Sequence, residues 1–239
     1  MSRLESAAGD ARSGPHVLVA DVDAPVLAGD DRHHLERVLR LRSGDPLTVG
    51  DGAGRWRPCR FSDEIEPIGE AVTVAAPSPV LAVGFAVLKG GRSETIVQKL
   101  TELGVDRIVP FVAERSVVRW DGAKSARQAQ RWRRVAREAV MQCRRLWLPE
   151  VEPVQLFGEL DLGGAALAVS EGRTLTTGEN FLLVGPEGGW TEAELASVDR
   201  HVCVGPHIMR AETAAIAAAA VLGARRSGHL PGAGTVSGS

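Results

Sequence analysis

The sequence has few cysteines and no long apolar run. Its three cysteines, Cys59, Cys143 and Cys203, lie far apart without C-x-x-C spacing, which argues against a disulfide framework or a cysteine zinc site. The longest apolar stretch, Ala214 to Leu222, is much shorter than the roughly 18 residues of a membrane helix. The amino terminus, MSRLESAAGDARSG, has no apolar core, so we expect no secretory signal there. These absences favour a protein of the reducing cytoplasm with neither a membrane nor a metal partner.

Two nucleotide-binding motifs are also absent. The phosphate-loop pattern G-x-x-x-x-G-K-[ST] occurs nowhere. The stretch from Gly50 to Gly54 breaks the G-x-G-x-x-G pattern of dinucleotide-binding folds, because Arg55 stands where the last glycine belongs. A nucleotide-type cofactor would therefore be bound in another way.

Lysine is scarce, and the basic side chains are clustered. Of 28 basic residues only Lys89, Lys99 and Lys124 are lysine. Residues 81–150 carry 14 basic and 7 acidic side chains, a net +7, between segments of net −4 and −5. Genome composition explains much of the arginine usage, but the clustering indicates a local anionic partner.

The amino-terminal part has the pattern of a small β-rich domain. We expect residues 1–15 to form a flexible tail and residues 16–76 to form a small barrel. A helix capped by Asp30 or Asp31 and ending near Leu41 interrupts strand-like runs. Residues 76–79, with two X-Pro steps, are typical of a linker.

Residues 80–228 have a different rhythm, in which apolar strands alternate with helices. Strands are predicted at 80–88, 107–112, 165–169, 181–184 and 202–204, and helices at 93–103, 125–146, 192–199 and 213–222. This alternation predicts a mainly parallel α/β sheet. The Gly- and Ser-rich residues 229–239 are expected to form a second flexible tail.

The predicted helix 125–146 separates into an apolar and a basic face. The apolar face comprises Trp132, Val135, Ala136, Ala139, Val140, Cys143 and Leu146. The basic face comprises Arg127, Arg131, Arg133, Arg134, Arg137, Arg144 and Arg145. Such a face binds phosphates, or it is a solvated surface paired with acidic neighbours, and the sequence leaves both interpretations open.

A glycine-rich loop follows the predicted strand 181–184. The segment Gly185-Pro186-Glu187-Gly188-Gly189 leads into a T-x-x-E capping box formed by Thr191 and Glu194. Open α/β sheets bind ligands at the carboxyl ends of their strands, and glycines without side chains allow close approach to the backbone. The alternative is a purely structural turn.

A second segment of the same kind runs from Val204 to Ala214. It includes Gly205-Pro206-His207-Ile208-Met209-Arg210-Ala211-Glu212-Thr213 and then enters an alanine-rich helix. The small side chains of that helix permit close approach to another helix or subunit, although alanine is also simply a good helix former. Arg210 and Glu212 could form a structural ion pair or take part in catalysis.

These two segments together, G-P-E-G-G and G-P-x-I-[LM]-R-x-E-T-A, resemble the RsmE-type methyltransferases of the SPOUT superfamily. The resemblance extends over most of the chain, through the H-L-x-x-V-L-R motif beginning at His34, the K-G motif beginning at Lys89 and the E-R-S motif beginning at Glu114. Members of this family transfer a methyl group from S-adenosylmethionine to N3 of a uridine in 16S rRNA. Three positions depart from the family pattern: His207 replaces arginine, Met209 replaces leucine, and Arg144 replaces glycine.

The resemblance implies a fold, a cofactor and an assembly. It implies a PUA-like RNA-binding domain over 16–76 and a SPOUT domain over 80–228 with a carboxyl-terminal trefoil knot, in a homodimer without metal. The cofactor pocket implied by analogy comprises Ser170, Glu171, Gly172, Val184, Gly185, Pro186, Glu187, Gly188, Gly189, Val204, Gly205, Ile208, Met209, Arg210 and Thr213. The partner that the resemblance implies is 16S rRNA or the small ribosomal subunit.

Residue roles follow as hypotheses. Arg210 would stabilise negative charge on the uracil imide, and Glu212 would orient Arg210 or accept a proton, with Glu187 as a weaker candidate base. The RNA-contact candidates are Arg40, Arg42, Lys89, Arg92, Arg115, Gln142 and Arg145. The alternatives are a non-catalytic RNA-binding ribosome-assembly factor and a SPOUT enzyme that methylates another RNA site.

Overall fold

The computed structural model describes residues 14–176 and 178–230, so most of both expected tails lies outside the described residues. The chain divides into two compact units. The first unit extends to Ala76 and also includes Arg137–Leu148, whereas the second comprises Pro77–Ala136 and the chain from Pro149 onward. Residues 137–148, which the sequence analysis placed in the second domain, therefore belong with the first unit.

Side-chain contacts explain why residues 137–148 belong to the first unit. The Arg137 guanidinium donates to both carboxylate oxygens of Asp31, at 3.0 and 2.7 Å, and to the Leu18 carbonyl at 3.0 Å. Met141 packs against the apolar core of this unit, and Trp147 forms a backbone bridge with Ala53. Nothing in the local helical pattern of the sequence encodes these distant contacts.

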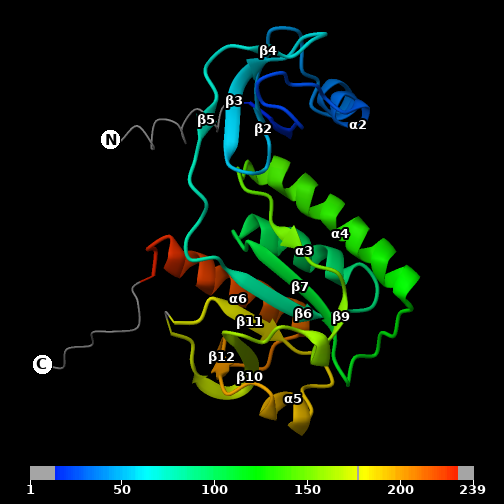
Figure 1. Ribbon diagram of the computed structural model, residues 1–239, viewed down its shortest axis with the longest axis vertical. Coiled ribbons are helices and arrows are strands. Elements are labelled where there is room, and N and C mark those ends of the chain that lie inside the picture. Colours follow the sequence, from blue (N-terminus) through cyan, green and yellow to red (C-terminus); the bar gives the residue numbers. More distant parts are fainter. Residues whose placement is uncertain (1–13, 177, 231–239) are drawn as a thin grey trace, which may run out of the picture. The chain divides into compact units, whose positions relative to one another are not determined.

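The first unit is built on a five-stranded sheet (Figure 1). Its strands are β1 (His16–Leu18), β2 (Pro46–Gly50), β3 (Arg55–Arg60), β4 (Glu66–Pro67) and β5 (Val72–Thr73). The predicted helix is divided into the α-helix α2 (Gly29–His33) and a π-helical turn η1 (His34–Val38). The expected aspartate cap is wrong, because Ala28 occupies the N-cap without a side-chain hydrogen bond.

A buried histidine lies in β1 of this unit. His16 Nδ1 is 2.9 Å from Thr48 Oγ1, and within the described ranges its Nε2 is buried without a partner. The pKa of His16 is lowered from 6.5 to about 4, because burial disfavours the imidazolium and the positive charge of Arg144 opposes it.

We therefore expect the free energy of unfolding to decrease as the pH falls from about 6.5 to about 4. In this pH window His16 binds a proton in the unfolded chain but not in the folded chain. At about 1.4 kcal/mol per pKa unit, the loss of unfolding free energy amounts to about 3 kcal/mol. Above pH 6.5 both states are neutral at His16 and the effect disappears. Urea unfolding at several pH values measures it, and His16→Gln should flatten the slope. An equally steep slope in that variant would assign the effect to other groups.

The second unit contains a seven-stranded sheet in the order β12-β10-β11-β6-β7-β8, with β9 also paired to β7. The strands are β6 (Ala82–Ala86), β7 (Arg107–Val112), β8 (Glu150–Val151), β9 (Gln155–Leu156), β10 (Ala165–Thr174), β11 (Phe181–Val184) and β12 (His201–Cys203). Every pairing within this sheet is parallel. The predicted parallel α/β architecture is confirmed.

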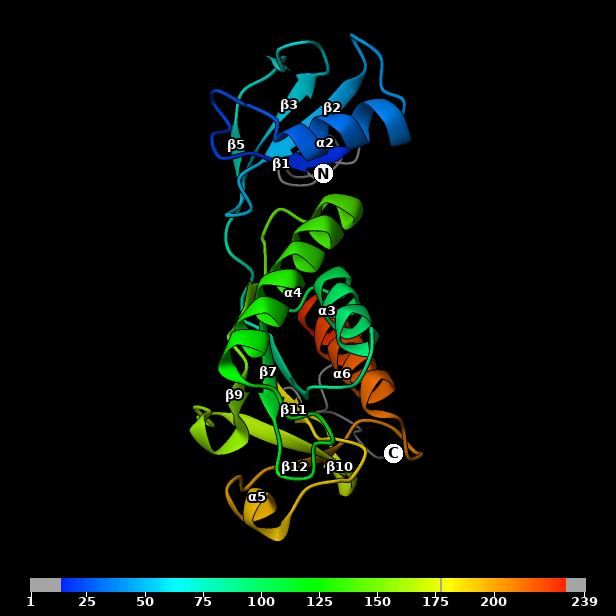
Figure 2. The same cartoon turned by 90° about the vertical axis from the view of Figure 1, so that its right-hand side faces the viewer.

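Helices pack against both faces of this sheet, and the three longest lie together (Figure 2). The helices are α3 (Arg92–Glu102), α4 (Gly122–Cys143), the short 3-10 helix η2 (Phe157–Glu159), α5 (Glu192–Ala196) and α6 (Ala211–Arg226). Side chains of α3, α4 and α6 share one core with Val83, Phe85 and Leu182. Side chains from η2 and α5 share the other core with Phe111 and Leu183. Every residue of β6 and β11 is buried. Burial on both faces of these central strands explains their continuous apolar runs.

Two helix boundaries differ from the sequence prediction for local reasons. Gly91, not Ser93, is the N-cap of α3, and the buried Ser93 hydroxyl instead accepts a hydrogen bond from the Leu88 amide at 3.1 Å. Helix α4 ends at Cys143, and Arg144 then adopts φ +57°. This left-handed conformation favours glycine, which explains why the family pattern has glycine where this chain has Arg144.

Candidate functional site

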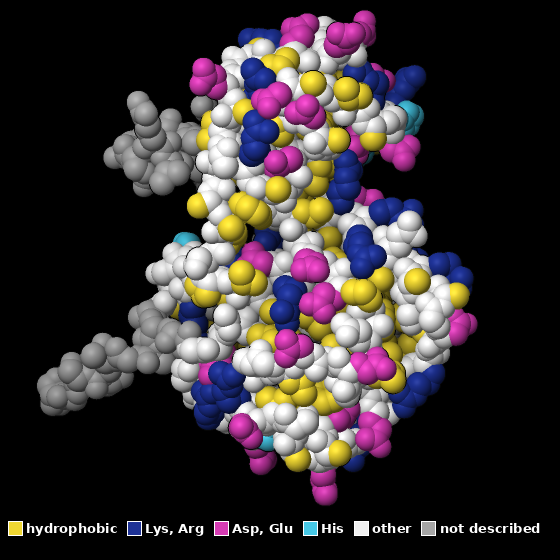
Figure 3. Space-filling model, in the orientation of Figure 1, with side chains coloured by type: hydrophobic (Ala, Val, Ile, Leu, Met, Phe, Trp, Pro, Cys, Tyr) yellow, Lys and Arg dark blue, Asp and Glu magenta, His cyan; other side chains and the backbone are white. Residues whose placement is uncertain are grey.

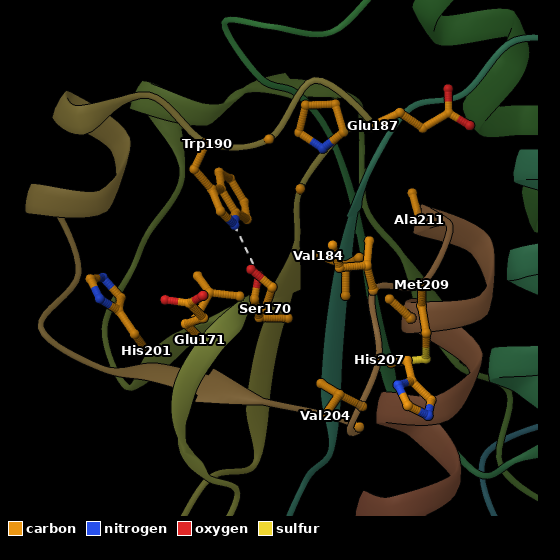
Figure 4. Close-up of a pocket in the computed structure, with 18 of the residues that line it drawn as sticks. Ser170, Glu171, Val184, Glu187, Trp190, His201, Val204, His207, Met209 and Ala211 are labelled. Carbon is orange, nitrogen blue, oxygen red and sulfur yellow. Dashed lines mark hydrogen bonds between the residues drawn. The ribbon is translucent and has the colours of Figure 1, made fainter.

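A cavity of about 460 Å³ lies beside the middle of β10, the carboxyl ends of β11 and β12 and the start of α6 (Figure 4). This volume lies within the range of about 300–1,000 Å³ typical of small-molecule sites. Eleven predicted cofactor residues line it: Ser170, Glu171, Val184, Gly185, Pro186, Glu187, Gly189, Val204, Gly205, Ile208 and Met209. Four others do not, namely Gly172, Gly188, Arg210 and Thr213. The two segments singled out in the sequence thus form walls of one cavity.

The glycine loop between β11 and α5 packs tightly against the indole ring of Trp190. A Cβ atom at Gly185 would lie 2.7 Å from the Trp190 ring, so the close approach at this position is to the indole. The Trp190 ring stacks on Phe111 with centroids 5.9 Å apart, and its Nε1 donates to the Ala168 carbonyl at 3.0 Å. Gly189 adopts φ +72°. These contacts hold Trp190 as a fixed wall of the cavity (Figure 4).

The predicted capping box is confirmed and does more than begin α5. Thr191 Oγ1 accepts from the Glu194 amide at 3.2 Å, and Glu194 Oε2 accepts from the Thr191 amide at 2.9 Å. The other oxygen of Glu194 accepts from the Glu114 amide at 2.9 Å. Arg115 donates to the Gly188 and Trp190 carbonyls at 3.3 and 3.0 Å. The loop after β7 therefore braces the glycine loop.

The segment between β12 and α6 supplies the opposite wall. Met209 and Val204 line the cavity, and Figure 4 shows both on the same side as Val184. The Ile208 side chain is 90% exposed. Arg210 is exposed at the N-cap of α6, between the lining residues Met209 and Ala211. Arg210 therefore lies in the chain between two residues of the cavity wall, without lining the cavity itself.

An ion cluster joins this segment to the glycine loop. Arg92 Nη1 lies 2.5 Å from Glu187 Oε1 and 3.7 Å from Glu212 Oε2. Within residues 14–176 and 178–230, Arg210 forms no ion pair, and Glu212 Oε2 is buried without a hydrogen-bond partner. An Arg210–Glu212 ion pair, one of the alternatives that the sequence left open, is not formed, because the α3 terminus brings Arg92 closer to Glu212. Arg92, expected to contact RNA, forms ion pairs with two carboxylates at this edge of the cavity.

The RNA-contact candidates are distributed over both units. Arg40, Arg42 and Gln142 are exposed in the first unit, where Arg145 is partly buried. Lys89 is exposed in the second unit, whereas Arg92 and Arg115 make the contacts described above. The structure supports both interpretations of the basic helix, since Arg131 pairs with Glu94 at 3.2 Å and Arg134 is exposed. Figure 3 shows basic and acidic side chains interspersed over the visible face.

Sequence reasoning missed eight residues that line the cavity. They are Ala168, Val169, Trp190, Leu195, His201, His207, Ala211 and Ala214. Trp190 directly follows the glycine loop, which was a usable signal. His201 and Leu195 carried none, because only the tertiary fold brings them to the strand ends.

Among residues 14–176 and 178–230, no group of three or more His, Cys, Asp or Glu side chains is arranged to hold a metal ion. No helix in the same ranges is long and apolar enough to cross a membrane.

The chain thus combines a parallel α/β unit, which carries the cavity, with a small β unit. Comparison with known proteins shows that RNA methyltransferases have this combination of domains. A model described as an RNA methyltransferase domain matches residues 76–223, and one described as an RNA methyltransferase PUA domain matches residues 27–68. The chain is 33% identical over 227 residues to the ribosomal RNA small subunit methyltransferase E of Mycobacterium tuberculosis, covering 83% of this chain and 85% of the relative. It is 31% identical over 217 residues to the Bacillus subtilis protein of the same name, covering 79% and 85%.

A solved structure agrees with these sequence matches. The Neisseria gonorrhoeae ribosomal RNA small subunit methyltransferase E bound to S-adenosyl methionine superposes with a TM-score of 0.72 at 26% identity, covering 87% of this chain and 96% of the other. The chain belongs to the ribosomal RNA small subunit methyltransferase E (RsmE) family. The family resemblance and the expected fold class are thereby confirmed, and the trefoil knot stays a prediction.

Proposed function

We propose that this chain transfers a methyl group from S-adenosylmethionine to N3 of a uridine in 16S rRNA. The observation that carries the proposal is that the glycine loop and the β12–α6 segment line the same cavity, in a chain of the RsmE family. A relative of this family carries S-adenosyl methionine in its solved structure. The proposed substrate is 16S rRNA, free or within the small ribosomal subunit, and the proposed compartment is the cytoplasm.

The residues of the cavity fit this cofactor. Val184, Val204 and Met209 offer apolar surface against which an adenine can pack. Ser170 and Glu171 offer polar groups for the ribose hydroxyls and the ammonium group. Gly205 leaves little space for a side chain, since a Cβ atom there would lie 3.2 Å from Met209 Cε. When bound, S-adenosylmethionine supplies an already activated methyl group, so the reaction needs no metal.

The chain's own task is to hold the uridine and manage the N3 proton. Uracil N3 attacks poorly until it loses this proton, and the departing proton leaves negative charge on the imide. Arg210, exposed beside the cavity and without an ion pair among the described residues, stabilises that charge. Glu212, whose Oε2 is free of hydrogen bonds in the same ranges, accepts the proton directly or through water. Arg92 positions this carboxylate.

RNA binding extends beyond the reacting base. Exposed arginines of the first unit, Arg40 and Arg42, and Lys89 of the second unit contact phosphates. The target uridine must be unpaired or flipped out to reach the cavity. We also propose a homodimer, on the basis of the family resemblance. It would contain two cofactor cavities and two sets of RNA-contact residues.

The test combines cofactor binding with mapping of the product. Calorimetry should detect binding of S-adenosylmethionine to the full chain. Incubation with 16S rRNA and labelled cofactor, followed by nucleotide mapping, should find one 3-methyluridine. Absence of cofactor binding would favour the non-catalytic assembly factor, and label on a ribose or on tRNA would favour the other SPOUT activity.

A further inference from the structure

A second cavity, of about 470 Å³, lies within the second unit, where the start of α3 meets α4 and the chain segment preceding it. It is lined by Lys89, Gly90, Gly91, Ser93, Glu94, Val117, Val118, Arg119, Trp120, Lys124, Gln128, Arg131 and Trp132. None of these residues lines the cofactor cavity. The proposed methyl transfer therefore leaves this space without a role.

The charge of the second cavity suits an anion. Four cationic side chains, Lys89, Arg119, Lys124 and Arg131, line it, against the single carboxylate of Glu94. Glu94 Oε1 pairs with Arg131 Nε at 3.2 Å. The Arg119 guanidinium donates to two backbone carbonyls, including that of Ala113 at 3.1 Å, so its positive charge is not cancelled there. An excess of positive charge remains.

The backbone at this cavity also favours an anion. Helix α3 has 11 residues, and its N-cap, Gly91, offers no side chain to the first amides. Free N–H groups at a helix N-terminus attract phosphates. A Cβ atom added at Gly90 would meet nothing within 4 Å, so the approach to this helix end is open.

Aromatic and hydrogen-bonding groups add features that a phosphate alone would not use. Trp120 is half-buried at the cavity, with Lys124 Nζ 5.6 Å from its ring centroid. Glu94 Oε2 and the Trp132 indole nitrogen are both buried without hydrogen-bond partners among the described residues. Buried polar atoms are rarely left unpaired. Here they offer one acceptor and one donor to an incoming base.

The two cavities flank the same helix terminus. Gly91 and Ser93 line the second cavity, and Arg92 between them holds Glu187 at the edge of the cofactor cavity. An RNA strand whose target base enters the first cavity can therefore place a nearby nucleotide in the second.

We propose that the second cavity binds a nucleotide of the substrate RNA close to the methylated uridine. Its phosphate lies against Lys89, Lys124 and the α3 amides, its base stacks on Trp120, and Glu94 Oε2 accepts a hydrogen bond from the base. Stacking on an aromatic side chain is the usual way in which unpaired RNA bases are held. This inference rests on the proposed function and specifies how its RNA substrate is recognised.

The test measures binding of a fluorescein-labelled 16S rRNA fragment to the full chain. Trp120→Ala should weaken RNA binding about tenfold, in line with the roughly 1–3 kcal/mol per stacked base, whereas Trp120→Phe should retain most of the affinity. Lys124→Ala should weaken binding and reduce the salt slope by about 0.7, because one phosphate contact is lost. Lys99→Ala, which removes a cation of α3 that lies outside the cavity and pairs with Glu102 at 2.7 Å, is the matched control and should change neither quantity. Affinity for S-adenosylmethionine should stay within twofold in all four variants.

A second measurement identifies the ligand chemistry. Uridine 5′-monophosphate should compete with the RNA fragment more strongly than inorganic phosphate does, and only in chains that retain Trp120. RNA affinity unchanged in Trp120→Ala and Lys124→Ala, with cofactor binding intact, would overturn the nucleotide site while leaving the proposed methyl transfer in place. Equal competition by phosphate and by the nucleotide would overturn base recognition.

Discussion

Replacing Arg210 by alanine should lower the rate of 16S rRNA methylation by about 100-fold or more, the usual effect of removing a preorganised group that stabilises developing charge. Arg210 is exposed at the start of α6, and its neighbours Met209 and Ala211 line the cofactor cavity. Because Glu212 pairs with Arg92, the Arg210 guanidinium is available to contact the uracil. Single-turnover methylation with labelled cofactor measures the rate.

The control for this variant is the binding of the cofactor. Arg210 itself does not line the cavity, so affinity for S-adenosylmethionine should change less than about threefold. Arg210→Lys keeps the positive charge but loses the forked geometry, and its rate should lie between those of the wild type and Arg210→Ala. Unchanged turnover in Arg210→Ala would remove this residue from the mechanism.

Gly185→Ala should reduce the affinity for S-adenosylmethionine at least tenfold. The added methyl group would lie 2.7 Å from the Trp190 ring, a distance that requires one of the two to move. Trp190 cannot shift alone, because it stacks on Phe111 and donates to the Ala168 carbonyl. The glycine loop and the cavity wall should therefore move together, and calorimetry of cofactor binding measures the effect.

Gly158→Ala provides the matched control for this substitution. A Cβ atom at Gly158 would meet nothing within 4 Å, so cofactor affinity should be unchanged. Thermal unfolding of both variants separates a displaced loop from a loss of fold. If folded Gly185→Ala binds the cofactor with wild-type affinity, then the contact with Trp190 does not shape the cavity.

The ion pair between Glu212 and Arg92 shows how the edge of the cofactor cavity is assembled. Arg92 lies 95 positions before Glu187 in the sequence, yet it joins the glycine loop to the start of α6. A residue assigned from the sequence to RNA contact thus holds two candidate proton acceptors. Whether Arg92 binds RNA or orients carboxylates depends on its contacts with Glu187 and Glu212. No local sequence pattern predicts these contacts.

The sequence by itself determined the elements whose signals are local. Apolar runs covered on both faces predicted β6 and β11, and the T-x-x-E pattern predicted the cap of α5, because such signals depend on residues a few positions apart. The two motif segments also predicted most of the cavity lining and the family.

Only the tertiary structure decided the contacts between distant segments. It assigned Arg137–Leu148 to the first unit, made Trp190 a wall of the cavity, and paired Arg92 with Glu187 and Glu212. These outcomes depend on which side chains the packed loops bring within a few ångströms of one another. A one-dimensional pattern encodes burial and caps, but not that choice of partners.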